Sequence, residues 1–198
     1  IQSCLSKYLY KSYFDKFWGV GISQTKFAKR IGFKDDDIKE GFYVADEIFF
    51  KNSITVNYEN HNHLNFLFIG RLAKEKNILR LIRAIELINK KFSTNHKLKI
   101  IGEGLELNKI LKFKSVDYLG LLTQKEIINI AKKCHVFCLP STFEPWGVVV
   151  HEMSAMGLPI LSSSNCGSSQ NLVINGFNGF QFNPFSINSI FKSIKVFC

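Results

Sequence analysis

The chain has 198 residues, of which 46% are hydrophobic and 21% are charged, and its formal net charge is +10. This composition predicts a globular protein with one well-buried core and excludes a disordered chain. No apolar run approaches the ~20 residues that a membrane-spanning helix needs, and no signal-peptide pattern opens the sequence. Because the first residue is Ile1 and not Met, we interpret the chain as a piece of a longer cytoplasmic protein.

The five cysteines are odd in number and show no Cys-x-x-Cys spacing, which predicts reduced thiols instead of disulfides or a zinc site. Cys134, His135 and Cys138 are close in sequence, but strand alternation would point the imidazole away from the two thiols. His61 and His63 have the spacing of metal ligands, yet they stand in a polar stretch that is typical of a solvated loop. We therefore expect no metal site.

The positive charge would suit nucleic acid, anionic lipid or a phosphorylated substrate as partner. The lysines are scattered along the chain, with local concentrations only at Lys90-Lys91, Lys132-Lys133 and the group Lys109, Lys112 and Lys114. Most of them are predicted to lie on solvated helix faces.

The first part of the chain, residues 1–58, predicts a short strand, helix, strand unit. The expected elements are a strand over Phe17–Ser23, a helix from its N-cap Ser23 to Arg30 that Gly32 stops, a turn at Asp35–Asp37 and an extended piece at Phe42–Val44. Such a unit cannot close a domain alone. We interpret it as the tail of a domain, and therefore as a partial second domain of this chain.

After a polar linker at Asn57–Asn65, short apolar runs alternate with amphipathic helical patterns. The expected strands are Phe66–Ile69, Leu98–Ile101, Val116–Leu119, Val136–Leu139, one that begins at Pro159–Leu161, and Phe180–Phe182. The expected helices are Asn77–Lys91, one after Gly104, and Gln124–Lys133. This alternation predicts right-handed crossovers and an α/β fold over residues 59–198, a Rossmann-like parallel sheet flanked by helices.

Ligands of parallel sheets lie beyond the carboxyl ends of the strands, so the loops after the strands are the candidate site. Gly70 and Arg71 follow the first strand, and Arg71 and Lys76 are candidate phosphate clamps. Gly102 and Gly104 follow the second strand and would let a base or ribose approach the backbone.

Two glutamates, Glu144 and Glu152, occupy the junction between the fourth strand and the next helix. This helix can start only after Pro145, and Gly147 leaves the backbone open where free helix N–H groups point outward. We therefore expect Glu144 in the loop at the helix mouth and Glu152 more than a turn inside the helix. Each motif also has an ordinary structural explanation, since Gly-x-Gly is weak and carboxylates near a helix start offset its dipole. Their joint order at the carboxyl ends favours a binding site.

From Phe17 to about Asn183 the chain resembles the retaining glycosyltransferases of family 4, which have the GT-B architecture of two facing Rossmann-like domains. The matching segments are Gly70-Arg-Leu-x4-Asn77, Gly102-Glu-Gly104, Tyr118-Leu-Gly120, Leu139-Pro-Ser, Glu144-x7-Glu152, Met156-Gly-Leu-Pro159 and Asn175-Gly-Phe-Asn-Gly179. The resemblance implies that residues 59–198 form the donor-binding domain and that residues 1–58 are the end of the acceptor domain.

The resemblance further implies roles for single residues. Arg71, Lys76 and Glu144 would be catalytic, the two cations on the donor diphosphate and the carboxylate on the hydroxyls of the sugar. The donor-binding residues would be Gly70, Gly102, Gly104, Leu122, Gly147, Val148 and Glu152, with Glu152 on the ribose hydroxyls. No metal or other cofactor is expected, because cationic side chains and helix N–H groups would neutralise the leaving diphosphate.

The activity implied is transfer of a sugar from a nucleotide-diphosphate sugar to a saccharide or lipid-linked acceptor, with retention, in bacterial surface polysaccharide synthesis. We expect a cytoplasmic location, possible peripheral contact with the inner membrane surface, and little or no transfer by this fragment alone. Many bacterial relatives carry acidic residues in the loop after the fifth strand, where this chain has neutral ones at 163–167 and at Gln170.

Two alternatives stay open. A sugar-nucleotide 2-epimerase has the same architecture, although the Glu144-x7-Glu152 spacing argues against it. A basic nucleic-acid-binding module would need aromatic and basic residues interleaved on one surface. The aromatic residues, such as Phe66 and Phe180, fall within apolar runs, so we expect burial and no nucleic acid partner.

Overall fold

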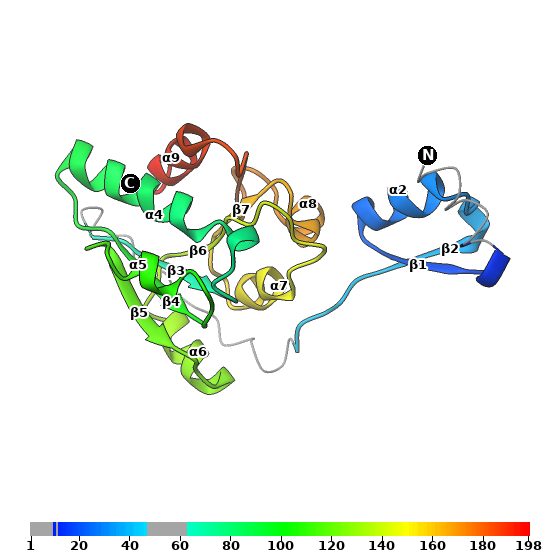
Figure 1. Cartoon of the computed structure of the whole chain (residues 1–198), viewed down its shortest axis with the longest axis horizontal. Coiled ribbons are helices and arrows are strands. Elements are labelled where there is room, and N and C mark those ends of the chain that lie inside the picture. Colours follow the sequence, from blue (N-terminus) through cyan, green and yellow to red (C-terminus); the bar gives the residue numbers. More distant parts are fainter. Residues whose placement is uncertain (1–9, 11, 47–62) are drawn as a thin grey trace. The chain divides into compact units, whose positions relative to one another are not determined.

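The computed structural model describes residues 10, 12–46 and 63–198 (Figure 1). The contacts within the chain divide it into two compact units, Ile1–Val44 and Ala45–Cys198, which we describe separately. The sequence predicts a domain boundary near residue 58, which lies outside the described residues, as do His61 and most of the predicted linker.

In the described part of the first unit, a helix packs on a two-stranded parallel sheet. Strand β1 (Phe17–Val20) pairs with β2 (Ile38–Gly41), and helix α2 (Ile22–Arg30) connects them through the 3₁₀ turn η1 (Asp35–Asp37). The small core that holds the helix on the sheet consists of Ala28, Ile31, Phe33 and Ile38, with Phe17 packed against it.

Three details of this unit differ from the prediction. Strand β1 ends at Val20 and not at Ser23, because α2 already begins at Ile22. The N-cap of α2 is Gly21 at φ 86°, and not Ser23, because the chain leaves β1 in a conformation that glycine adopts without strain. The second strand is Ile38–Gly41 and not Phe42–Val44. Its Lys39 and Glu40 are exposed, so the strand lacks the apolar signal that the prediction relied on.

The second unit contains a six-stranded sheet in the order β5-β4-β3-β6-β7-β8, and every neighbouring pair is parallel. The strands are β3 (Asn65–Ile69), β4 (Lys97–Ile101), β5 (Val116–Gly120), β6 (Val136–Leu139), β7 (Ile160–Ser163) and β8 (Gly179–Phe182). The predicted α/β fold with a parallel sheet is confirmed. The order means that the chain runs outward from β3 to β5, then returns to β6 and runs outward on the other side.

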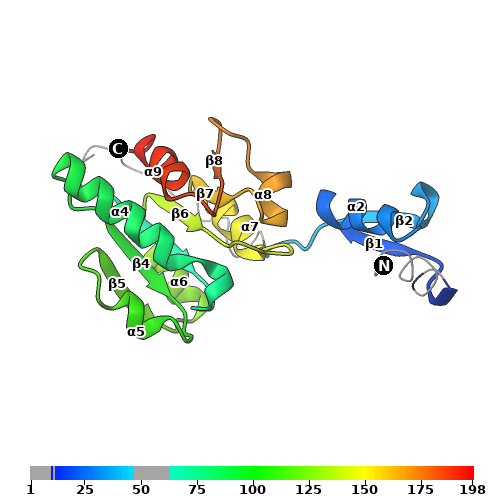
Figure 2. The same cartoon turned by 45° about the horizontal axis from the view of Figure 1, so that its top comes forward.

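Helices cover both faces of this sheet (Figure 2). They are α4 (Ile78–Phe92), α5 (Leu107–Ile110), α6 (Gln124–Ala131), α7 (Val148–Ala155), α8 (Gly167–Leu172) and α9 (Ile187–Lys195). Right-handed crossovers place α4 and α5 on one face and α6, α7 and α8 on the other. Helix α9, which the sequence analysis did not predict, packs against α4.

The linker prediction also needs a correction at its end. Asn65 is not linker but the first residue of β3, and Leu64 before it is fully buried. The polar side chain of Asn65 hid this strand start from the prediction. Its polar groups are accommodated there by hydrogen bonds: the amide N–H donates to Nδ1 of His135 (2.9 Å) and the side-chain amide donates to the Lys133 carbonyl (3.3 Å).

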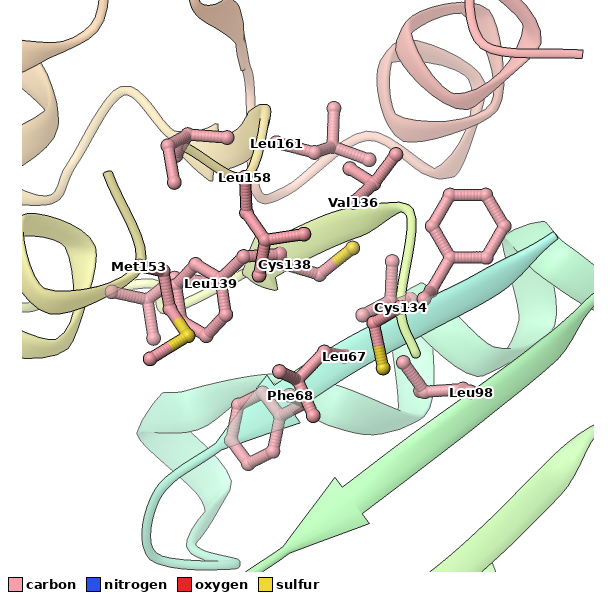
Figure 3. Close-up of a cluster of buried hydrophobic side chains, with 14 of the residues drawn as sticks. Leu67, Phe68, Leu98, Cys134, Val136, Cys138, Leu139, Met153, Leu158 and Leu161 are labelled. Carbon is pink, nitrogen blue, oxygen red and sulfur yellow. The ribbon is translucent and has the colours of Figure 1, made fainter. Parts of the chain in front are cut away.

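The core lies between the central strands and the helices on both faces (Figure 3). Phe66, Leu67 and Phe68 of β3 are fully buried, as a central strand of a parallel sheet requires. Cys134 and Cys138 are buried here as free thiols; burial raises the pKa of Cys134 to about 12 and that of Cys138 well above its usual range. These thiols therefore act as small apolar side chains.

Within the described part of the chain, no group of histidine, cysteine and carboxylate side chains could hold a metal ion. The same residues include no helix that is both long and apolar enough to cross a membrane.

A buried histidine lies at the amino ends of the central strands. His96 is fully buried, its Nδ1 accepts a hydrogen bond from the Leu64 amide (3.0 Å), and its ring meets the Phe66 ring edge to face at 6.0 Å. Desolvation, with smaller contributions from nearby His63 and His135, lowers its pKa to about 4. The folded state therefore holds His96 neutral.

We predict that stability falls as the pH falls from 7 to 4. Because the folded pKa of His96 lies below its ordinary value of 6.5, the unfolded chain binds a proton in this range that the folded chain does not. The contribution reaches up to ~3 kcal/mol, at ~1.4 kcal/mol per pKa unit. Urea unfolding at several pH values should show a clearly weaker pH dependence for His96→Asn, and an unchanged dependence would contradict the assignment.

Candidate functional site

The strand order reverses direction between β3 and β6. The loop after β3 leads toward one edge of the sheet and the loop after β6 toward the other, so a topological switch point lies between them. Lys76 comes from the first loop and Glu144 from the second, and Lys76 Nζ forms an ion pair with Glu144 Oε2. Only 17% and 13% of the two side chains are exposed. The structure thus brings together two of the three predicted catalytic residues at the switch point.

Backbone hydrogen bonds tie the two loops to each other. The 3₁₀ turn η2 (Lys74–Lys76) precedes α4, and the carbonyl of Glu75 accepts hydrogen bonds from the Thr142 amide (2.8 Å) and hydroxyl (3.1 Å). Because Glu75 and Thr142 are close in sequence to the two charged residues, this contact helps to hold the ion pair.

The loop after β7 holds Glu144 from the other side. The Glu144 amide donates to the Asn165 carbonyl (3.2 Å), and the Glu144 carbonyl accepts from the Gly167 amide (3.0 Å). Glu144 and Cys166 thereby form a short parallel bridge beyond the ends of the strands. Ser141 also donates its hydroxyl to Glu144 Oε2 at 3.4 Å.

Gly147 is the N-cap of α7, in the left-handed conformation at φ 86°. An ideal Cβ at this position would lie 3.0 Å from Cγ of Glu144 and 3.1 Å from Sγ of Cys166. Val148 is the first helical residue, so its N–H is among those that a helix leaves without a partner in its own backbone. The predicted placement of Glu144 at the helix mouth is confirmed. The structure explains Gly147 by its positive φ and by the side chains packed against it, and its predicted role of leaving the backbone open to a ligand stays a prediction.

Glu152 lies more than a turn inside α7, as predicted. Its side chain is partly buried, and desolvation raises the pKa of the carboxyl, with nearby His151 acting in the opposite direction. Glu152 belongs neither to the Lys76–Glu144 pair nor to the lining of the pocket that lies at the ends of β3, β4 and β5.

This pocket has a volume of about 370 Å³ and is mostly apolar. Its lining consists of Ile69, Gly70, Arg71, Ile101, Gly102, Glu103, Leu121, Leu122 and Ile127. Arg71 is 72% exposed at this position and pairs with Glu75 Oε1 at 2.8 Å. Four of the predicted residues, Gly70, Arg71, Gly102 and Leu122, are therefore gathered at the pocket, separately from the ion pair.

The structure explains Gly102 and Gly104 by contacts within the chain. A Cβ on Gly102 would lie 2.1 Å from the Gly70 carbonyl oxygen, and one on Gly104 would lie 2.4 Å from that of Leu72. Their φ angles of +130° and +153° also favour glycine. The glycines let the loops after β3 and β4 pack closely, and Gly104 does not line the pocket.

Several residues of the site were missed by the sequence analysis. Glu75, Thr142 and Asn165 connect the loops, and Ile101 and Ile127 form walls of the pocket. The position of Thr142 and Asn165 in loops after strands is the only signal that could have indicated them. Ile101 and Ile127 look like ordinary core residues in sequence.

Comparison with known proteins gives the class. Residues 50–197 match the family of glycosyl transferases group 1, and the chain therefore belongs to this family.

Individual relatives agree with this class. The chain is 31% identical over 153 residues to an uncharacterized glycosyltransferase of Methanocaldococcus jannaschii, which covers 73% of this chain and 37% of the relative. It is 26% identical over 136 residues to glycogen synthase of Mycobacterium tuberculosis, covering 65% of the chain and 32% of the relative. The chain thus spans about a third of the length of these relatives.

Solved structures share the fold. The apo form of the lipopolysaccharide outer core galactosyltransferase WaaB aligns with a TM-score of 0.81 at 20% identity, over 94% of this chain and 53% of that one. HepE of Anabaena in complex with UDP and glucose aligns with a TM-score of 0.73 at 18% identity, over 92% of this chain and 53% of its own.

We predict that Gly102→Ala destabilises the chain far more than Gly120→Ala. Both glycines have positive φ, but a Cβ at Gly120 would meet nothing within 4 Å, whereas at Gly102 it would overlap backbone. Strain alone should cost ~1 kcal/mol at Gly120, and the overlap should add at least ~2 kcal/mol at Gly102. Thermal unfolding checks this, and equal Tm values for the two variants would contradict it.

We also predict strong coupling between Lys76 and Glu144. Removing one partner leaves a mostly buried charge unpaired, so Lys76→Met and Glu144→Gln should each cost ~2 kcal/mol or more. The double variant should be less destabilised than the sum, with a coupling of at least ~1 kcal/mol. Denaturant unfolding of the four proteins measures this cycle, and additive effects would show that the two charges do not interact.

Proposed function

We propose that this chain carries the donor-binding part of a retaining glycosyltransferase of family 4 that uses a nucleotide-diphosphate sugar. The observation that carries the proposal is the Lys76–Glu144 pair at the switch point of the sheet, together with an apolar pocket at the same edge that has Arg71 on its lining. A cation, a carboxylate and an apolar pocket correspond to the three parts of such a donor, its diphosphate, its sugar and its base.

In this proposal the pocket takes the nucleoside. Ile101, Leu122 and Ile127 are apolar walls against which a planar base can pack, and backbone amides of the neighbouring loops can recognise its edge. Arg71 is exposed and pairs with Glu75, which is also partly exposed, so its guanidinium can turn to a phosphate. Glu152, partly buried in α7, would take the ribose hydroxyls.

The chemistry would take place at the ion pair. Lys76 stabilises the negative charge that develops on the diphosphate as the glycosidic bond breaks, and Arg71 adds a second cation. Glu144 accepts hydrogen bonds from hydroxyls of the donor sugar, and the amides near Gly147 and Val148 bind sugar or phosphate oxygens. These groups offset the charge of the leaving group, so no metal cofactor is expected.

The acceptor would be a saccharide or a lipid-linked saccharide. The names of two relatives support this, a UDP-Gal:alpha-D-GlcNAc-diphosphoundecaprenol galactosyltransferase of Escherichia coli and a diNAcBac-PP-undecaprenol-based N-acetylgalactosaminyltransferase of Campylobacter jejuni, each 30% identical. Residues 1–58 would be the end of the acceptor domain, and the fragment alone would transfer little or nothing. We further propose a cytoplasmic location, and the net charge of +10 supports contact with the inner membrane surface.

The test is ligand-observed NMR of this chain with UDP-, GDP-, ADP- and dTDP-sugars. One nucleotide series should bind, and Arg71→Ala should weaken that binding at least tenfold without changing Tm, because the Arg71 side chain is 72% exposed. Arg83→Ala, which removes an exposed arginine from α4, is the matched control and should bind like the unmodified chain. No binding by a folded chain, or equal binding by Arg71→Ala, would contradict the proposal.

A further inference from the structure

Asn77 occupies the N-cap position of α4, but its side chain does not cap the helix. It is the N-cap residue and adopts the left-handed conformation at φ 56° and ψ 27°, and its side chain makes no capping hydrogen bond to the helix backbone. Asparagine is a favoured N-cap because its side chain usually accepts a hydrogen bond from the first helical turn. Here that side chain serves another purpose.

The amide of Asn77 connects three loops at the carboxyl edge of the sheet. Its Nδ2 donates to the carbonyls of Pro140 in the loop after β6 and Pro184 in the loop after β8, each at 2.9 Å. Its Oδ1 accepts from Nη1 of Arg80 at 2.8 Å, and the same Nη1 donates to the Pro184 carbonyl at 3.0 Å. Both amide protons are used, so a carboxylate of the same shape could not replace Asn77.

These hydrogen bonds lie next to the ion pair in the sequence. Asn77 directly follows Lys76, and Pro140 begins the segment that ends at Glu144. The bond from Asn77 to Pro140 therefore fixes the distance between the two chain segments that carry the opposite charges. Both charged side chains have several rotatable bonds, and ordering them costs conformational entropy. They therefore form the ion pair only if the two backbone segments are held close together.

We propose that Asn77, supported by Arg80, is a positioning group that holds Lys76 and Glu144 in their donor-binding arrangement. With the loops fixed, the cation and the carboxylate are in place before a donor arrives. The free energy of ordering them therefore does not reduce the free energy of binding. The donor-binding role of this arrangement rests on the proposed function, but the positioning of the pair can be tested without any nucleotide.

The first test measures the Lys76–Glu144 coupling in an Asn77→Gly background. Glycine keeps the left-handed conformation without strain and removes only the side-chain bonds. The coupling from the Lys76→Met and Glu144→Gln cycle should fall by at least half. Ser93→Gly is the matched control, because Ser93 has φ 55° at the other end of the same helix. Coupling that is unchanged in Asn77→Gly would overturn the inference.

A second variant protects the test against a failure of Asn77→Gly to fold. Arg80→Met removes the hydrogen bonds that Arg80 donates to Asn77 Oδ1 and to the Pro184 carbonyl, but it leaves the bond from Asn77 Nδ2 to the Pro140 carbonyl. It should therefore lower the Lys76–Glu144 coupling by a smaller factor. If Asn77→Gly does not fold, and the Lys76–Glu144 coupling in Arg80→Met equals that in the unmodified chain, the inference would also be overturned.

The second test measures the affinity for the nucleotide sugar that the unmodified chain binds. Asn77→Gly should weaken it at least fivefold and Ser93→Gly should not change it. Binding that is equal in Asn77→Gly would overturn the positioning role. A chain that binds no nucleotide sugar, yet loses the coupling in Asn77→Gly, would overturn the proposed function and support the positioning of the pair.

Discussion

The ion pair between Lys76 and Glu144 depends on the order of the strands. The chain leaves β3 toward β4 and β5 and returns on the other side through β6, so the topological switch point of the sheet lies between the loops after β3 and β6. Two opposite charges that are mostly buried meet at this switch point, and each would be costly without the other. Hydrogen bonds from the loops after β7 and β8 support them, through Asn165 and Pro184. The carboxyl edge of the sheet is thus one connected structure.

Close packing of backbone loops is the second constraint on this edge. Gly102 and Gly104 are needed because the loop after β4 passes within contact distance of carbonyls in the loop after β3. Gly147 is needed because the side chain of Glu144 lies against it. A sequence motif rich in glycine can therefore belong to a binding site and still be explained by the packing of the chain. In this protein the two explanations apply to the same edge of the sheet.

The sequence predicted the elements that bury continuous apolar runs. Strands such as Phe66–Ile69 and the long amphipathic α4 were found within one or two residues, since their patterns have the period of the structure. The prediction failed where an element is exposed or short. Strand β2 carries Lys39 and Glu40 outward, and the cap of α2 is Gly21. Helix α9 is neither exposed nor unusually short, and it was missed because no element was predicted after Phe182.

The candidate site was predictable in position but not in its contacts. The rule that ligands lie at carboxyl ends indicated Arg71, Lys76 and Glu144, and the structure brings the last two into contact. No local pattern could show that Glu75 holds Arg71 or that the amide of Asn77 reaches Pro140 and Pro184. These partners are far apart in sequence or depend on side-chain direction, so only the folded chain defines them.

The measurement that tests the account most directly is a crystal structure of the chain with a bound nucleotide-diphosphate sugar. We predict the base between Ile101, Leu122 and Ile127, the diphosphate within hydrogen-bonding distance of Arg71 and Lys76, and Glu144 facing the sugar. A nucleotide bound elsewhere, with the Lys76–Glu144 pair intact and remote from it, would contradict the central claim.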